Sequence, residues 1–387
     1  MNSPRSMVFR LLLLISILFS IPQVRAEPIV PGYQHLAGSP SSAGQVLLQE
    51  LKCFPCHGAE NPFPVKRKTP TLLGLRNRVK PGYLRSFLEN PSHEKPGAVM
   101  PNLFEGWADR EREDAIENIL HFLYSLPDEA TRSNREETDY DIAEGDELFH
   151  TVGCVACHEP RRKSQRIEDE FGEEIEWERE EPVKEKSASI SLPDLKRKTW
   201  LKPLARFLMN PYNTRPGGRM PDMKLSEQEA GSIAAYLLNG EAVSPKVMFE
   251  PYPDRIEKGQ RLFHEIGCTN CHSSAGKKEA YSLKAPALSD LDLESDTGCL
   301  SADPERGVPD YGLTDTQKRD LKIAIKERRK EDFHPSATET VRHTMASLNC
   351  YACHKRNGMG GPASDKDPYF TGGWSEEMGE EGRVPPD

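Results

Sequence analysis

The chain has 387 residues and a formal net charge of −10 at pH 7, with 51 Lys and Arg against 61 Asp and Glu. This acidic balance argues against nucleic acid as a partner, because phosphate backbones bind basic surfaces. Hydrophobic residues make up only 36% of the chain, which favours several small cores in which a large apolar group fills part of each interior.

The N-terminus predicts export. Arg5 and Arg10 precede an apolar stretch at residues 11–21, and a small-residue cleavage site ends at Ala26. The apolar stretch is too short for a membrane span, which needs about 20 residues. We therefore expect residues 1–26 to be a signal peptide, with an uncleaved anchor as the alternative. The mature protein is expected to be periplasmic or secreted, without a transmembrane span.

The sequence Cys-x-x-Cys-His occurs four times, which is the pattern of covalent c-type haem attachment. The two thiols form thioethers with the haem, and the adjacent histidine ligates its iron. Zinc ribbons pair two such motifs about 15–20 residues apart, which does not fit the wider spacing here. We predict four haem c groups, numbered 1 to 4 in chain order, with covalent attachment at Cys53, Cys56, Cys154, Cys157, Cys268, Cys271, Cys350 and Cys353 and iron ligation by His57, His158, His272 and His354.

The segments around these motifs repeat. A glycine lies nine residues before the first cysteine in three copies, at Gly44, Gly145 and Gly259, inside a predicted leading helix. A Pro-x-Leu follows the motif in three copies, and a closing helix then ends each module. Capping boxes at Ser226 and Thr314 predict where two of the closing helices begin.

A leading helix, Cys-x-x-Cys-His, Pro-x-Leu, Met-Pro and a closing helix together resemble the class I cytochrome c fold across residues 40–330. The chain is also similar to bacterial multihaem cytochromes built of tandem cytochrome c domains. The resemblance implies a mainly α fold of tandem helical haem modules joined by charged linkers. It also implies electron transfer with other redox proteins as donor and acceptor, rather than catalysis. The expected modules are 40–126, 140–240 with an acidic insertion at 159–186, 254–330, and an incomplete one at 338–387.

Two Met-Pro pairs are predicted to supply the sixth iron ligands. Met100 is the candidate for haem 1 and Met220 for haem 2, where a methionine sulfur raises the reduction potential. Met223 is an alternative to Met220, and His93 and His121 are weaker alternatives to Met100.

The third module departs from this pattern, because Val308 stands where the repeat predicts methionine. Haem 3 is therefore expected to take Tyr311, His334 or His343, or to have an open face. An open five-coordinate haem 3 gives the alternative function, a peroxidase-like small-molecule oxidoreductase.

The fourth module stops at Asp387, before a distal loop and closing helix. We expect a truncated protein. A second chain that completes the pocket, or ligation by Met359 or Met378, are the alternatives. Cys299 is expected to be a free thiol, and His150 and His264 are expected near the surface or the haem propionates.

Overall fold

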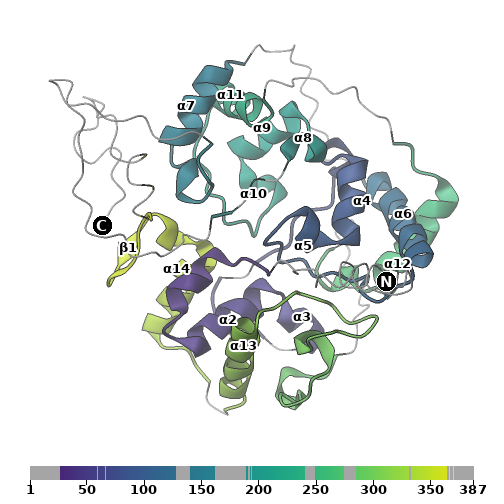
Figure 1. Cartoon of the computed structure of the whole chain (residues 1–387), viewed down its shortest axis with the longest axis vertical. Coiled ribbons are helices and arrows are strands. Elements are labelled where there is room, and N and C mark those ends of the chain that lie inside the picture. Colours follow the sequence, from purple (N-terminus) through teal and green to yellow (C-terminus); the bar gives the residue numbers. More distant parts are fainter. Residues whose placement is uncertain are drawn as a thin grey trace, which may run out of the picture.

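The computed structural model describes residues 27–127 except 59 and 66, 140–161, 189–239 except 191 and 193, 249–273, 285–330, 333–363, 366 and 369. These residues form a mainly helical structure, as expected (Figure 1). One short antiparallel hairpin joins β1 (Lys355–Arg356) to β2 (Met359–Gly360). The predicted signal peptide, nearly all of the acidic insertion and Met378 lie outside the described residues.

The predicted leading helices are α2 (Pro40–Glu50), α7 (Ile142–Thr151), α12 (Pro253–Glu265) and α14 (Ala337–Leu348). The predicted closing helices are α6 (Asp109–Ser125), α11 (Glu227–Leu237) and α13 (Asp315–Arg328). The motifs begin in α3 (Cys53–His57), η3 (Cys154–Ala156), η4 (Cys268–Asn270) and η7 (Cys350–Ala352). The remaining helices are η1 (Pro31–Leu36), η2 (Leu75–Asn77), α4 (Pro81–Glu89), α5 (Pro91–Glu94), α8 (Leu195–Lys198), α9 (Leu201–Met209), α10 (Pro211–Thr214), η5 (Leu288–Asp290) and η6 (Gly298–Leu300).

Side-chain caps fix where several of these helices begin. Both predicted capping boxes are confirmed, at Ser226 with Glu229 and at Thr314 with Gln317. The structure adds a third at Ser336, which begins α14. Each such cap stabilises its helix by about 1 kcal/mol.

In the second module, the leading and closing helices come from contiguous sequence. Helix α7 packs on α11, and α9 covers the other side of α11. The crossing is close because Gly145 has no side chain, and a Cβ there would overlap the carbonyl of Ser232. Phe149, Leu204 and Ile233 fill the core behind this crossing.

The first and third modules differ from the expected arrangement, because they exchange their helices. Helix α2 packs on α13, and α12 packs on α6 (Figure 1). The repeated glycines lie at these crossings. A Cβ on Gly44 would overlap the carbonyl of Asp320 in α13, and a Cβ on Gly259 would overlap that of Asn118 in α6. Residues 40–126 and 254–330 therefore do not each enclose their own helix pair.

The physical reason is that the repeated sequence determines which surface of a leading helix packs against a closing helix. It does not determine which copy of the closing helix that is. The leading helices α2, α7 and α12 each have a glycine at the crossing, which lets a closing helix approach closely, so either pairing satisfies the same sequence pattern. The distal loops of the two exchanged parts also meet. Asn102 and Asp310 form an antiparallel bridge, with N–O distances of 2.7 and 2.9 Å. They occupy equivalent positions after Met100-Pro101 and Val308-Pro309, so the two parts meet around a local two-fold relation.

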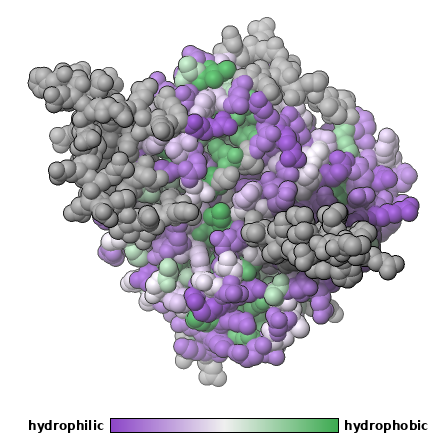
Figure 2. Space-filling view, viewed as in Figure 1, coloured by the Kyte–Doolittle hydropathy of each residue, from purple (hydrophilic) through white to green (hydrophobic). Residues whose placement is uncertain are grey.

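Helix α14 packs against η1 and α2, where Gly32 lies against the backbone of Ala346. Figure 2 shows a mainly hydrophilic face with small apolar patches. Within the described part of the chain, no helix has both the length and the apolar character needed to cross a bilayer.

Candidate functional site

Three apolar clusters each enclose the first cysteine of one motif. Cys53 packs with the cluster of α2 and α13, Cys154 with that of α7 and α11, and Cys268 with that of α12 and α6. Each cluster therefore joins a leading helix, a closing helix and a motif. This is the environment that an apolar macrocycle tethered at the cysteine needs.

A left-handed residue turns the chain from each leading helix into its motif. These residues are Lys52, Gly153, Gly267 and Asn349, with φ values of 61°, 99°, 91° and 60°. A single tight turn follows, in which the histidine amide donates to the carbonyl of the first cysteine in the last three motifs, at 2.9–3.0 Å. The turn brings two thiols and an imidazole together, as thioether attachment with axial ligation requires.

Backbone carbonyls hold the ring orientation of the motif histidines. His57 Nδ1 lies 2.7 Å from the carbonyl oxygen of Pro286, and His158 Nδ1 lies 2.9 Å from that of Ile190. A carbonyl that accepts from Nδ1–H leaves the Nε2 lone pair free for iron. Burial lowers the pKa of His158, so the ring is neutral, as a ligand must be.

His272 lies beside the equivalent carbonyl of Pro70. Burial lowers the pKa of His272 and the Pro70 carbonyl raises it, although Nδ1 lies outside normal hydrogen-bond geometry. The Thr69 hydroxyl donates to the Cys271 carbonyl at 2.6 Å. The Pro-x-Leu turn that begins at Pro70 thus lies against motif 3, and the turn that begins at Pro286 lies against motif 1.

The motif thiols are surrounded by protein but not sealed. Burial raises the pKa of Cys154, Cys157 and Cys271 to about 11 and that of Cys268 to about 12, while all keep partial solvent access. None of the nine cysteines, all of which lie in the described part of the chain, forms a disulfide. Thiols that are deeply placed yet line accessible space, next to a ligand-ready imidazole, fit the attachment of haem c.

The motifs lie in two neighbouring pairs. Cys56 raises the pKa of Cys271 electrostatically, and Asn270 of motif 3 lowers the pKa of Cys56. Asn349 Nδ2 lies 3.5 Å from Cys157 Sγ, and Cys353 also acts on the pKa of Cys157. Motif 1 is therefore beside motif 3, and motif 2 is beside motif 4.

The two predicted methionine ligands occupy different clusters from one another. Met220 packs with the cluster of Cys154, in the same module. Met100 packs with the cluster of Cys268, whereas haem 1 was the predicted site for it. The cluster of Cys53 instead receives Tyr311, whose hydroxyl donates to the Leu51 carbonyl at 2.8 Å.

The alternative histidine ligands lie elsewhere. His93 and His334 are on the exposed surface. His121 is buried and accepts from the Tyr252 amide at 3.0 Å, which is the packing role expected of it. His343 stacks on Phe63 with ring centroids 3.6 Å apart, and burial lowers its pKa to about 4.

His150 differs from the expected surface position, because it is buried. Its Nδ1 lies 2.8 Å from the Asp146 carbonyl and its Nε2 accepts from the Arg161 amide at 3.1 Å. The ring also packs near Tyr369, with centroids 5.7 Å apart. Lys366 forms an ion pair with Glu159 at 3.2 Å. Residues that follow motif 4 therefore contact the second module.

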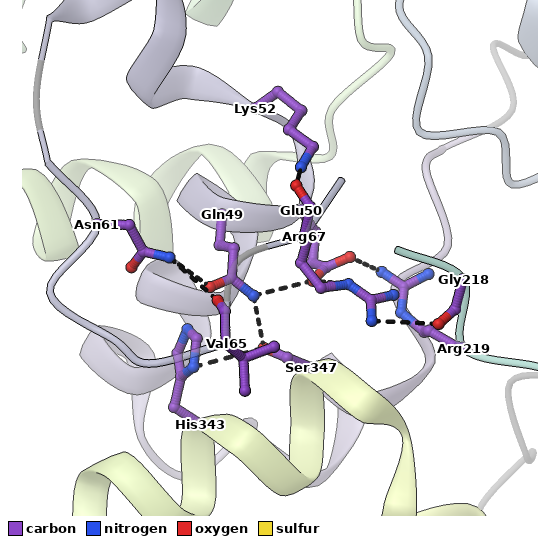
Figure 3. A network of polar contacts seen from close by, with 10 residues as sticks. All are labelled: Gln49, Glu50, Lys52, Asn61, Val65, Arg67, Gly218, Arg219, His343 and Ser347. Atoms are coloured by element: carbon purple, nitrogen blue, oxygen red, sulfur yellow. Dashed lines mark hydrogen bonds and ion pairs between the residues drawn. The ribbon is translucent and has the colours of Figure 1, made fainter. Parts of the chain in front are cut away.

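A buried ionic network, which sequence reasoning missed, joins three parts of the molecule (Figure 3). Glu50 of α2 pairs with Arg67 at 3.1 Å and with Arg219, the residue before Met220. The side chains of Glu50 and Arg67 are only 4% and 5% exposed. Gln49 donates to Ser347 of α14 at 3.1 Å. These charges lie far apart in sequence and carry no motif, so only the fold brings them together.

Comparison with known proteins identifies one part of the chain. Residues 142–241 match the cytochrome c family, so a cytochrome c domain lies there, and that family implies covalently bound haem c. Three curated relatives from Helicobacter pylori, each named Cbb3-type cytochrome c oxidase subunit CcoP, are 42% identical over 60 residues. The match covers 16% of this chain and 20% of each relative, so the chain spans about a fifth of their length. No solved structure matches.

Proposed function

We propose that the protein is an exported tetrahaem c-type cytochrome that transfers single electrons between redox proteins. The observation that carries this proposal is the arrangement of the motifs. Four motifs lie as two adjacent pairs, and three of them enter apolar clusters of the kind that the cytochrome c domain at 142–241 provides. The CcoP relatives belong to an oxidase by name, which supports a redox partner here as well.

The chain's own residues have clear tasks in this function. The eight motif cysteines would tether the four haem groups, and the four motif histidines would ligate iron through Nε2. When bound, haem supplies a one-electron Fe(III)/Fe(II) couple. Apolar clusters line three of the sites, and the carbonyls of Pro286 and Ile190 fix the ring orientation of His57 and His158. Met220 would raise the potential at its site.

The test is a quantitative haem assay with reductive titration of the mature protein. We expect four covalent haems per chain, all reversibly reduced by a chemical reductant and reoxidised by a soluble acceptor. Fewer than four haems would contradict the haem count. Haems that do not cycle reversibly would contradict electron transfer. Co-purification of a second chain tests the partner predicted to complete the fourth module.

The second candidate function is a peroxidase-like oxidoreductase. It was predicted on an open haem 3, but Met100 packs with Cys268 and argues against an open site there. The cluster of Cys53 contains Tyr311, whereas the cluster of Cys268 contains Met100. The site at Cys53 is therefore the better candidate for an open haem and for this second function. Peroxide turnover at a rate above that of free haem, in a protein with a cyanide-binding haem, would support the enzyme.

A further inference from the structure

We infer that haem sites 1 and 3 are exchanged pockets: Met100 serves the haem attached at Cys268 and Cys271, while the haem attached at Cys53 and Cys56 faces Tyr311 and has no methionine ligand. The inference rests on the proposed function, since it requires haem at these motifs. It reverses the order that contiguous modules predict, in which haem 1 has Met100 and haem 3 is open.

On the side of the motif histidine, each of the two sites combines residues from both the first and the third module. The carbonyl that holds His57 belongs to Pro286, and the hydroxyl bound to motif 3 belongs to Thr69. Each site therefore takes its motif from one sequence module and its Pro-x-Leu turn from the other. The helices follow the same exchange, because α2 packs on α13 and α12 packs on α6. Each pair therefore joins one helix of the first module to one helix of the third.

The distal sides follow the same exchange. The bridge between Asn102 and Asp310 places the two distal loops side by side at the boundary between the sites. In the segment before it, Val99 packs with the cluster of Cys53 and Met100 packs with the cluster of Cys268. Neighbouring residues of this loop therefore lie against different sites, and the methionine lies on the side of site 3 and not of site 1.

The residues around site 1 offer no strong ligand in place of a sulfur. Tyr311 donates its hydroxyl to the Leu51 carbonyl at 2.8 Å, and burial raises its pKa well above the ordinary value, so the phenol keeps its proton. Burial also raises the pKa of the nearby Cys299 thiol to about 11. Met345 and Met359 touch the same large cluster from α14 and β2. Figure 1 shows α14 and the hairpin on one side of α2 and the motif helix α3 on the other.

An iron at site 1 without a methionine ligand is a place for a small exogenous ligand. The crossed contacts of His57 with Pro286 and of Thr69 with Cys271 bring motif 3, whose cluster includes Met100, beside motif 1. A second haem held with Met100 would therefore lie near it. The structure thus pairs a ligand-binding site with an electron-transfer site, and the ligand class is a small diatomic or anionic iron ligand, for which cyanide is the probe.

The first test removes one haem at a time from the full-length mature protein. Cys53→Ala with Cys56→Ala is expected to remove the part of the high-spin, cyanide-binding signal that comes from site 1 and to keep the charge-transfer band of methionine-ligated ferric haem at full strength. Cys268→Ala with Cys271→Ala is expected to keep the high-spin signal and to lose part of that band. Glu257→Gln, which breaks only an exposed ion pair with Arg261, is the control and is expected to leave both signals unchanged.

The reverse assignment of the two signals would overturn the inference while leaving the proposed function intact. A wild-type protein with four haems that are all low-spin would overturn it in the same way. A chain without covalent haem would instead defeat the proposed function.

A second measurement covers the case in which a haem-deletion variant fails to fold. Ser41 of α2 hydrogen-bonds Glu327 of α13, so Ser41→Cys with Glu327→Cys is expected to be joined by a short thiol-specific cross-linker in a chain that keeps its four haems. Mass spectrometry of the digested protein identifies the linked peptides. Two free thiols at these positions in a chain with four haems would contradict the exchange.

Discussion

The second module and the exchanged pair of sites are built from the same repeat and assembled differently. In the second module, Gly145 and Ser232 meet within one contiguous stretch. In the exchanged pair, Gly44 meets Asp320 and Gly259 meets Asn118, so each contact joins a residue of the first module to one of the third, with the second module between them in sequence. A glycine at the helix crossing serves both arrangements. Local sequence therefore determines which surfaces of the leading and closing helices pack together. The fold of the whole chain determines which leading helix packs on which closing helix.

This difference has a functional consequence. A contiguous module carries its attachment motif, its Pro-x-Leu turn and its methionine together, so its ligand set can be predicted from sequence order. An exchanged site takes these parts from two places, so the ligand set changes even though every motif is recognised correctly. Met100 illustrates this, because its sequence context indicates a ligand but its neighbour in space is Cys268 and not Cys53.

The largest expected effect comes from breaking the ionic network that connects the two regions. Glu50→Gln leaves Arg67 and Arg219 facing each other without their buried carboxylate. Loss of one partner of a buried ion pair costs about 3–5 kcal/mol. We expect the free energy of unfolding from urea titration to fall by that order. Because Arg219 precedes Met220, the spectrum of haem 2 should also change.

Glu257→Gln is the matched control for this variant, because it breaks an exposed ion pair with Arg261 and should cost less than about 1 kcal/mol. Equal losses in the two variants would show that the Glu50 network does not connect the regions.

Acid is expected to weaken the contact between His343 of α14 and Phe63. Burial lowers the pKa of His343 from 6.5 to about 4, so the folded state holds a neutral ring. Its contribution is complete above about pH 6.5 and is lost as the pH falls toward 4, up to about 3 kcal/mol. Urea titrations between pH 7 and 4 measure this loss, and His343→Gln should flatten the profile. An identical slope in the variant would rule out His343 as the cause.

Replacing the glycine at a helix crossing by valine tests the second module and the exchanged pair separately. Gly145→Val should disturb only the second module, whereas Gly44→Val should separate α2 from α13. Overpacking of this kind costs about 1–3 kcal/mol. We expect partial haem loss at motif 2 in the first variant and at motif 1 in the second, measured by mass spectrometry of haem peptides. Gly82→Ala is the control, since nothing lies within 4 Å of a Cβ there. Haem loss at motif 3 alone in Gly44→Val would contradict the place of α2 in the cluster of Cys53.

The smallest effect, about 1 kcal/mol, is expected from removing a helix cap. Ser226→Ala should raise amide hydrogen exchange in α11 and α7. Thr314→Ala should raise it in α13 and α2, because these helices pack together. Increased exchange in α12 instead of α2 would argue for the contiguous arrangement.

Much of the fold and of the site was predictable from particular residues. The capping boxes at Ser226 and Thr314 begin helices as predicted, and the glycines nine residues before each motif lie at helix crossings. These features depend on neighbours within a few turns of the chain. The helix partners of α2 and α12 were not predictable, because two equivalent closing helices satisfy the same pattern.

The buried charges show the same limit. Glu50, Arg67 and Arg219 each look like ordinary surface residues in sequence, and only tertiary packing makes them a desolvated network. His150 is similar, since its burial depends on Arg161 and on the segment that includes Tyr369.

The central claim, an exported chain that carries four covalent haems, is tested most directly by the intact mass of the mature protein. We predict the mass of a chain cleaved near Ala26 plus four haem groups, with all eight motif cysteines modified. A mass that corresponds to fewer haems, or to a chain without covalent haem, would contradict the account.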